Sequence, residues 1–314
     1  MSASILIGDV REQLDTLKDQ SVQCCVTSPP YYGLRDYGVA GQIGLEPTLA
    51  EYIATMVDVF RGVRRVLADD GTLWLNIGDS YAGGGRGGHG DGLNGTPPQG
   101  IGNAYPKSTL SGMKPKDLMM VPARLAIALQ DDGWYLRSDI IWAKPNPMPE
   151  SVRDRPTSAH EHIFLLTKQA KYFYDADAVR EPYNESSLSR YDSPLQSTSP
   201  GGRQPGKQMD GENTTFGPNP LGRNTRNVWT ITTQPFSEAH FATFPPEIPR
   251  RCIKAGSREG DTILDPFLGS GTTLLVADEL GRNGIGIELN ADYAAMAERR
   301  ITGACPMFTD VRVA

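Results

Sequence analysis

Short runs of β-branched and other apolar residues recur along the chain, and Gly, Asp or Pro bound most of them. Runs of this length and composition are typical of strands that are buried on both faces of a sheet. The runs lie at Ser4–Ile7, Val22–Thr27, Thr72–Ile77, Asp139–Trp142, His162–Thr167, Thr262–Leu264 and Ile285–Glu288. The pattern therefore predicts a buried β-sheet.

Helices are predicted between several of these strands. In one segment the apolar residues fall on one face at a spacing of about 3.6 residues; they are Leu49, Ile53, Met56, Val57, Phe60 and Leu67. A second helix is expected to begin at Pro122, whose fixed φ suits a first helical turn. Further helices are expected after Thr272 and Ala291. This alternation of strands and helices predicts an α/β fold.

Two segments interrupt the pattern. Eight of the thirteen residues of Gly83–Gly95 are glycine, so this segment is expected to be a loop without a core. The segment 183–227 is rich in Ser, Pro, Gly, Asn and Gln, and is either a linker or a recognition insert. We therefore divide the chain into residues 1–182, 183–227 and 228–314.

Composition excludes several classes of protein. The 314 residues, 39% of them hydrophobic, are enough for one substantial core and a smaller appended region. The formal net charge of −6 argues against nonspecific coating of nucleic acid, so any contact with DNA requires a local basic surface. No stretch approaches the roughly 20 apolar residues that cross a bilayer, and no signal peptide is evident. We expect an intracellular, cytoplasmic protein.

No metal site is expected. The four cysteines (24, 25, 252 and 305) have no Cys-x-x-Cys spacing, so neither zinc nor disulfides are indicated. His160 and His162 would share one face of a strand, but no third ligand is evident. We expect a structural role for both.

The first chemical motif is Thr27–Tyr31, with the sequence Thr-Ser-Pro-Pro-Tyr, which directly follows a predicted strand. Open α/β sheets bind ligands at the carboxyl ends of their strands. Consecutive prolines hold the chain extended and stiff, which suits a preorganised site. A Pro-rich turn is the alternative interpretation of these five residues.

The second motif is Asp265–Thr273, with the sequence Asp-Pro-Phe-Leu-Gly-Ser-Gly-Thr-Thr, between a predicted strand and a predicted helix. Gly269 and Gly271 permit close approach of a ligand to the backbone. The third glycine of a dinucleotide site and the lysine of a phosphate-binding loop are both missing. Glu288 ends the next strand, where an acidic residue can bind both hydroxyls of a ribose. An adenosyl cofactor without phosphates fits these features.

These motifs resemble those of the β-class amino-methyltransferases of DNA, the N4-cytosine and N6-adenine enzymes of restriction-modification systems and phages. In that family the catalytic motif, the target-recognition insert and the cofactor motif occur in the order seen here. The resemblance implies a Rossmann-like, S-adenosylmethionine-dependent methyltransferase sheet with helices on both faces and a loop-rich insert, here residues 183–227.

The resemblance also implies the site residues. The catalytic residues would be Ser28, Pro29, Pro30 and Tyr31. The residues that bind S-adenosylmethionine would be Asp9, Phe244, Asp265, Pro266, Phe267, Gly269, Ser270, Gly271, Thr272 and Glu288. The pocket for the target base would be lined by Asn76, Gly78 and Asp79. No metal is implied.

The implied reaction needs no covalent intermediate. The Ser28 side chain and the Pro29 carbonyl would hold the two amino hydrogens, so that the nitrogen lone pair can face the methyl group. Tyr31 would stack on a base flipped out of double-stranded DNA. Phosphate contacts are expected from basic residues in or beside loops, namely Lys114, Lys116, Lys144, Arg153 and Arg155. A companion restriction endonuclease is a further expectation.

Ser28 favours N4-methylcytosine as the product, because N6-adenine enzymes of this family usually carry Asp at that position. A hydroxyl can also donate to the ring nitrogen beside the amino group, whereas a carboxylate only accepts. Adenine offers the same pair of groups, so N6-adenine methylation stays an alternative. Methylation of structured RNA and a catalytically silent regulator that binds DNA or cofactor are more distant alternatives.

Overall fold

The computed structural model describes residues 2–34, 38–82, 113–184, 219–234, 244–304 and 310–314. The chain divides into two compact units, one of residues 1–175 and 227–314 and one of residues 176–226. The glycine-rich segment Gly83–Gly95 and most of the segment 183–227 lie outside the described residues. The fold below is that of the larger unit.

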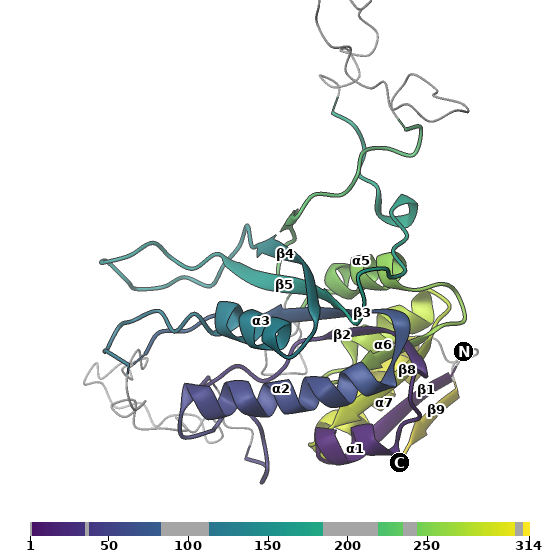
Figure 1. The fold of residues 1–314 in the computed structure, drawn as a ribbon, viewed down its shortest axis with the longest axis horizontal. Helices are drawn as coiled ribbons and strands as arrows, with labels where there is room; N and C mark the ends of the chain where they lie inside the picture. The colour runs from purple at the N-terminus through teal and green to yellow at the C-terminus, as the bar shows by residue number, and fades with distance from the viewer. Residues whose placement is uncertain (1, 35–37, 83–112, 185–218, 235–243, 305–309) are drawn as a thin grey trace, which may run out of the picture. The chain divides into compact units, whose positions relative to one another are not determined.

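Within the described residues, nine strands form one sheet in the order β6-β4-β5-β3-β2-β7-β8-β1-β9 (Figure 1). Seven of them are the predicted strands: β1 (Ser2–Ile7), β2 (Val22–Thr27), β3 (Leu67–Ile77), β4 (Tyr135–Ala143), β5 (His160–Thr167), β7 (Thr262–Asp265) and β8 (Asn283–Glu288). Two strands were not predicted: β6 (Val228–Thr230), which has three residues, and β9 (Asp310–Val313), which is largely exposed.

Strand direction determines which residues meet at each edge of the sheet. The strands β3, β2, β7, β8 and β1 are parallel, so their carboxyl ends lie along one edge, which we call the functional edge. β5 is antiparallel to β3 and to β4, with His162 opposite Ile77 and His160 opposite Ala143. The start of β5 therefore lies beside the carboxyl ends of β3 and β4.

Helices cover both faces of this sheet, as predicted (Figure 1). On one face lie α1 (Val10–Thr16), α2 (Leu49–Val66) and α3 (Val121–Asp131), and on the other lie α5 (Glu247–Gly256), α6 (Thr272–Glu279) and α7 (Ala291–Ala304). The helices α1 and α5 were not predicted, because α1 has only seven residues and α5 contains a proline. No helix in the described residues is long and apolar enough to cross a membrane.

Local signals explain where two of the predicted helices begin and end. Thr48 and Glu51 form a capping box at the start of α2, each side chain bonded to the other residue's backbone N–H. Pro122 lies in the first turn of α3, as expected. The predicted extension of the first helix to Leu67 is wrong, because the backbone becomes extended there and Leu67 begins β3.

Adjacent cysteines on β2 show how the two faces pack. Cys25 belongs to the core between the sheet and α1, α2 and α3, whereas Cys24 faces α5, where Gly256 approaches it. Both thiols are fully buried, and burial raises the pKa of Cys24 to about 12. Both thiols therefore belong to the packed interior.

The backbone of Gly256 packs so closely against its neighbours that an added methyl group would clash with them. A Cβ there would lie 2.4 Å from Thr72 Oγ1 and 2.9 Å from Cys24 Sγ. We expect Gly256→Ala to lower the free energy of unfolding by about 1 to 3 kcal/mol, the usual cost of overpacking. Urea unfolding followed by circular dichroism measures this.

Gly303 supplies the control, because it lies in α7 and a Cβ there would meet nothing within 4 Å. Gly303→Ala should leave stability unchanged or raise it by up to about 1 kcal/mol, through helix propensity. Equal effects of the two substitutions would contradict this description of the packing.

Candidate functional site

The segment Ser28–Tyr31 leaves the carboxyl end of β2 and is anchored on both sides. Pro29 is buried, and the Pro30 carbonyl accepts a hydrogen bond of 2.9 Å from the Tyr52 hydroxyl on α2. Ser28 and Tyr31 are half-buried. The two prolines and the α2 contact therefore hold Ser28 in a fixed place at the functional edge.

A polar network joins this segment to three other strand ends. The Tyr31 hydroxyl donates to Glu161 Oε2 at 2.7 Å, and Lys144 Nζ forms an ion pair with Glu161 Oε1. Asn76 Nδ2 lies 2.9 Å from Glu161 Oε2, 3.1 Å from the Tyr31 hydroxyl and 3.3 Å from Ser28 Oγ. We call these five residues the Glu161 network.

The network is enclosed by small and buried groups. A Cβ on Gly78 would lie 2.8 Å from the Tyr31 ring, so the ring packs directly against the backbone after β3. Burial and then the Glu161 charge raise the pKa of Tyr31 well above its usual value. The Tyr31 hydroxyl therefore keeps its proton at neutral pH and acts as a donor.

Asn76 Oδ1 is buried and has no hydrogen-bond partner among the described residues. Buried side-chain carbonyls without a partner are uncommon in folded proteins. Reversing the amide would place Oδ1 next to the Glu161 carboxylate, so the observed orientation is the favourable one. Asn76 Oδ1 is therefore an unsatisfied acceptor buried within the network.

Glu161 and Lys144 were not predicted as members of this site. Lys144 was assigned to phosphate contacts, and Glu161 was given no role. Side chains alternate along β5, so Glu161 points to the other face of the sheet from His160 and His162. On the face of the two histidines, His162 Nδ1 contacts Asp139 at 2.9 Å. That alternation was a usable signal, but the antiparallel direction of β5 was needed to place Glu161 beside Tyr31.

The other basic residues expected to contact phosphate are mostly paired. Lys114 pairs with Asp117, Lys116 with Asp154 and Arg155 with Glu150. Arg153 is exposed. The histidine pair has no further ligand, and no group of three or more His, Cys, Asp or Glu residues in the described part of the chain could hold a metal ion.

The second motif begins with a buried carboxylate. Asp265, at the end of β7, accepts hydrogen bonds from the Thr27 hydroxyl at 2.7 Å, the Thr273 hydroxyl at 2.6 Å and the Phe267 N–H at 3.1 Å. Burial raises its pKa to about 6, and the hydrogen bonds partly oppose this. Asp265 thus connects the residue before Ser28 to the glycine turn.

The glycine turn is held from two directions. Gly269 and Gly271 have φ values of 53° and 78°, in the left-handed region that favours glycine. The Gly269 N–H donates to Glu288 Oε2 at 2.8 Å, and the Asn290 N–H donates to Oε1 at 2.9 Å. From α7, Arg300 donates to the Ser270 and Thr272 side chains, at 3.0 and 2.8 Å.

The remaining predicted cofactor residues lie on or near the same edge. Pro266 is buried and Phe267 is half-buried. Asp9 follows β1, which pairs with β8, but its carboxylate caps α1 and forms an ion pair with Arg11 at 2.8 Å. This Arg11 contact lowers the pKa of Asp9. Phe244 is half-buried, three residues before α5.

The turn and Glu288 are chemically suited to an adenosyl group. A Cβ on Gly269 would meet nothing within 4 Å, so that side of the turn is open to a ligand. Each Glu288 oxygen accepts one backbone N–H and keeps a further lone pair for a hydroxyl. Burial raises the pKa of Glu288.

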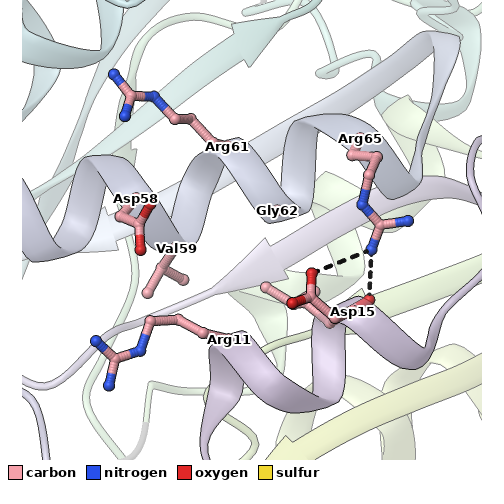
Figure 2. Close-up of a pocket in the computed structure, with 8 residues that line it drawn as sticks. Arg11, Asp15, Asp58, Val59, Arg61, Gly62 and Arg65 are labelled. Atoms are coloured by element: carbon pink, nitrogen blue, oxygen red, sulfur yellow. Dashed lines mark hydrogen bonds and ion pairs between the residues drawn. The ribbon is translucent and has the colours of Figure 1, made fainter.

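Two surface hollows lie elsewhere. One, of about 300 Å³, lies between α1 and α2 (Figure 2) and is lined by Arg11, Leu14, Asp15, Asp58, Val59, Arg61, Gly62 and Arg65. Its three arginines pair with carboxylates, so they offer no free charge to an anion. The other, of about 380 Å³, includes Asp69, Tyr172 and Arg258. Neither contains a predicted site residue.

With this geometry established, comparison with known proteins identifies the family. The model of the N6 and N4 methyltransferase family, described as DNA methylase, matches residues 22–299. The chain belongs to this family. The predicted β-class amino-methyltransferase resemblance is thereby confirmed.

Individual relatives agree with this assignment. The type II methyltransferase M.SmaI of Serratia marcescens is 49% identical over 301 residues, which are 96% of this DNA methylase and 91% of that protein. The solved PvuII DNA methyltransferase (cytosine-N4-specific) has a TM-score of 0.62 at 19% identity, covering 99% of this chain and 95% of its own. A Thermus thermophilus protein solved with S-adenosyl-L-methionine has a TM-score of 0.61 at 22% identity, covering 99% of both chains. The two structures confirm the Rossmann-like methyltransferase fold.

The raised pKa of Asp265 predicts a specific pH dependence of stability. The folded state holds a proton on Asp265 up to about pH 6, whereas the unfolded carboxyl loses it near 3.8. Stability therefore falls as pH rises between these values and stays lower above them. From pH 5 to pH 7.5 we expect wild type to lose about 1 to 2 kcal/mol relative to Asp265→Asn.

Urea unfolding of both proteins across this range measures the difference, and other titrating groups cancel because the two chains share them. Parallel stability profiles for the two proteins would show that Asp265 does not titrate in this window.

Proposed function

We propose that this DNA methylase transfers a methyl group from S-adenosylmethionine to the N4 amino group of cytosine in double-stranded DNA. The observation that supports this most is Ser28, a neutral hydroxyl at the end of β2 where N6-adenine enzymes usually carry Asp. Its Oγ is held by Asn76 and Tyr31 at the functional edge. Methylation of adenine N6 is the alternative outcome of the test below.

S-adenosylmethionine supplies an electrophilic methyl group on a sulfonium. In our proposal Glu288 takes the ribose hydroxyls, and the open turn at Gly269 lies against the adenosyl group. Asp9, Phe244 and the other residues of Asp265–Thr272 named above complete the site in this proposal. Asp265 and Thr272 act through the shape of the turn, since Thr27, Thr273 and Arg300 already occupy their polar atoms.

The target amino group needs acceptors for its two hydrogens. Ser28 Oγ has one free lone pair, since its proton is directed to Tyr31 and the other lone pair faces Asn76. The Pro30 carbonyl is occupied by Tyr52, so Pro29 is the candidate acceptor of the two proline carbonyls. We assign the amino hydrogens to Ser28 Oγ and the Pro29 carbonyl.

The orientation of Ser28 changes one part of the sequence argument. The Tyr31 hydroxyl has a single hydrogen, which goes to Glu161, so Ser28 must be the donor in its contact with Tyr31. The Ser28 proton is then unavailable to the ring nitrogen of the base. In our proposal Ser28 acts toward the base only as an acceptor, and the Tyr31 ring stacks on the flipped base.

We further propose that residues 183–227 read the DNA sequence, as the target-recognition insert. The relatives are type II methyltransferases, so a companion restriction endonuclease and a place in the bacterial cytoplasm are parts of the same proposal.

Replacing Glu288 tests the cofactor site. We expect Glu288→Ala to weaken binding of S-adenosylhomocysteine by about 5- to 150-fold, the loss of charge-assisted hydrogen bonds worth about 1 to 3 kcal/mol. Calorimetry measures this affinity. Glu259→Ala is the matched control, because Glu259 is exposed and outside the site. An unchanged affinity in Glu288→Ala would remove Glu288 from the cofactor site.

The product tests the proposed function. DNA from a host that lacks other methyltransferases and expresses this chain should contain N4-methylcytosine by mass spectrometry of its nucleosides. Ser28→Ala should lower turnover by at least about 100-fold while cofactor affinity stays within about twofold. N6-methyladenine without N4-methylcytosine would overturn the cytosine assignment and leave the amino-methyltransferase reaction intact.

A further inference from the structure

The Glu161 network has a direction that the proposed reaction can use. Tyr31 donates its only hydrogen to Glu161 Oε2, and Ser28 donates to the Tyr31 oxygen at 3.4 Å. Asn76 Nδ2 has two hydrogens and lies within hydrogen-bond distance of all three residues. Because it can only donate, it cannot reverse this order. The hydrogen bonds therefore run from Ser28 through Tyr31 to a carboxylate.

Methylation of an amino group leaves one proton too many. When the new carbon–nitrogen bond forms and the carbon–sulfur bond breaks, the positive charge passes from sulfur to the amino nitrogen. The nitrogen must then lose a proton to give the neutral methylated base. Ser28 is the group assigned to one of its hydrogens, but a serine hydroxyl cannot keep an added proton near neutral pH.

We infer that Glu161 is the final proton acceptor of methyl transfer, reached through a relay of Ser28 and Tyr31; this inference rests on the proposed function. The amino nitrogen gives its proton to Ser28 Oγ, the Ser28 proton passes to the Tyr31 oxygen, and the Tyr31 proton passes to Glu161 Oε2. Ser28 and Tyr31 end neutral, as they began, and Glu161 becomes a neutral carboxylic acid.

The surroundings of Glu161 suit this role. Lys144 forms an ion pair with Glu161 Oε1, which leaves Oε2 to face the Tyr31 hydroxyl. The Glu161 side chain is 15% exposed, so the proton can pass to water after the reaction. Within the described residues, the titratable groups that bond to Glu161 are Lys144, just after β4, and Tyr31, in the segment after β2. On β5 itself, alternation turns His160 and His162 to the other face, and Asp139 is paired with His162.

Single-turnover methylation of duplex DNA with Glu161→Gln and Tyr31→Phe tests the relay. Gln keeps the shape of Glu161 but cannot hold the proton, and Phe breaks the relay while the ion pair with Lys144 stays. We expect each to slow methyl transfer by about 100-fold, with affinities for S-adenosylhomocysteine and DNA within about threefold of wild type. Glu259→Gln and Tyr135→Phe are the matched controls, because both side chains are exposed and outside the network.

Two readouts separate a relay from a merely structural role. The pH profile of the methyl-transfer rate should differ between wild type and Glu161→Gln, because glutamine cannot take up the proton. The double variant should be no slower than the slower single variant, because both break one relay. Rates equal to wild type, an unchanged pH profile in Glu161→Gln, or multiplied losses in the double variant would overturn the relay.

If Glu161→Gln does not bind cofactor, the methyl-transfer rate of Tyr31→Phe alone tests the relay. Methylation of adenine instead of cytosine leaves the same test in force, because either base carries the amino group. Wild-type protein without any transfer to DNA would overturn the proposed function together with the relay, whereas wild-type transfer with undiminished variants overturns the relay alone.

Discussion

The site depends on the buried carboxylate of Asp265. A charge or polar group buried without partners is costly, and Asp265 is surrounded by three donors, from Thr27, Thr273 and Phe267. Thr27 lies immediately before Ser28, while Phe267 and Thr273 flank the glycine turn. Residues 238 positions apart in the sequence are thus held by one side chain. The distance between the proposed methyl donor and the proposed amino acceptor is set by this contact, and small errors in such a distance slow group transfer.

Around this contact, the directions of the strands gather the other groups. Ser28, Glu288 and the glycine turn lie at one edge because they follow or end parallel strands, as ligand-binding residues do in other open α/β sheets. Because β5 is antiparallel, its first residues lie at the same edge. Glu161 is therefore next to Asn76 and Tyr31. The edge therefore combines the proposed cofactor region at β7, β8 and β1 with a polar region at β2, β3, β4 and β5.

The charges and hydrogen-bonding groups of the polar region compensate one another. Glu161 would be costly to bury alone, but Lys144, Tyr31 and Asn76 together satisfy its two oxygens. Glu161 in turn fixes the direction of the Tyr31 and Ser28 hydroxyls, so a neutral serine becomes an oriented acceptor. The negative charge of Glu161 lies two hydrogen bonds away from Ser28, rather than on the residue at position 28 itself.

The sequence by itself determined the predicted strands, both motifs and the α/β class, because hydrophobic runs, prolines and glycines act on the local backbone. It also placed Ser28 and Glu288 at strand ends, since a strand's end is visible in its own residues. The short elements α1, β6 and β9 were not predicted, because few residues carry little periodicity, and α5 was not predicted because it contains a proline. Only the tertiary structure decided that Glu161 and Lys144 join Ser28 and that Asp265 holds Thr27. Those contacts depend on which strands become neighbours and in which direction they run, and pairing between distant segments is set by the packing of the whole sheet.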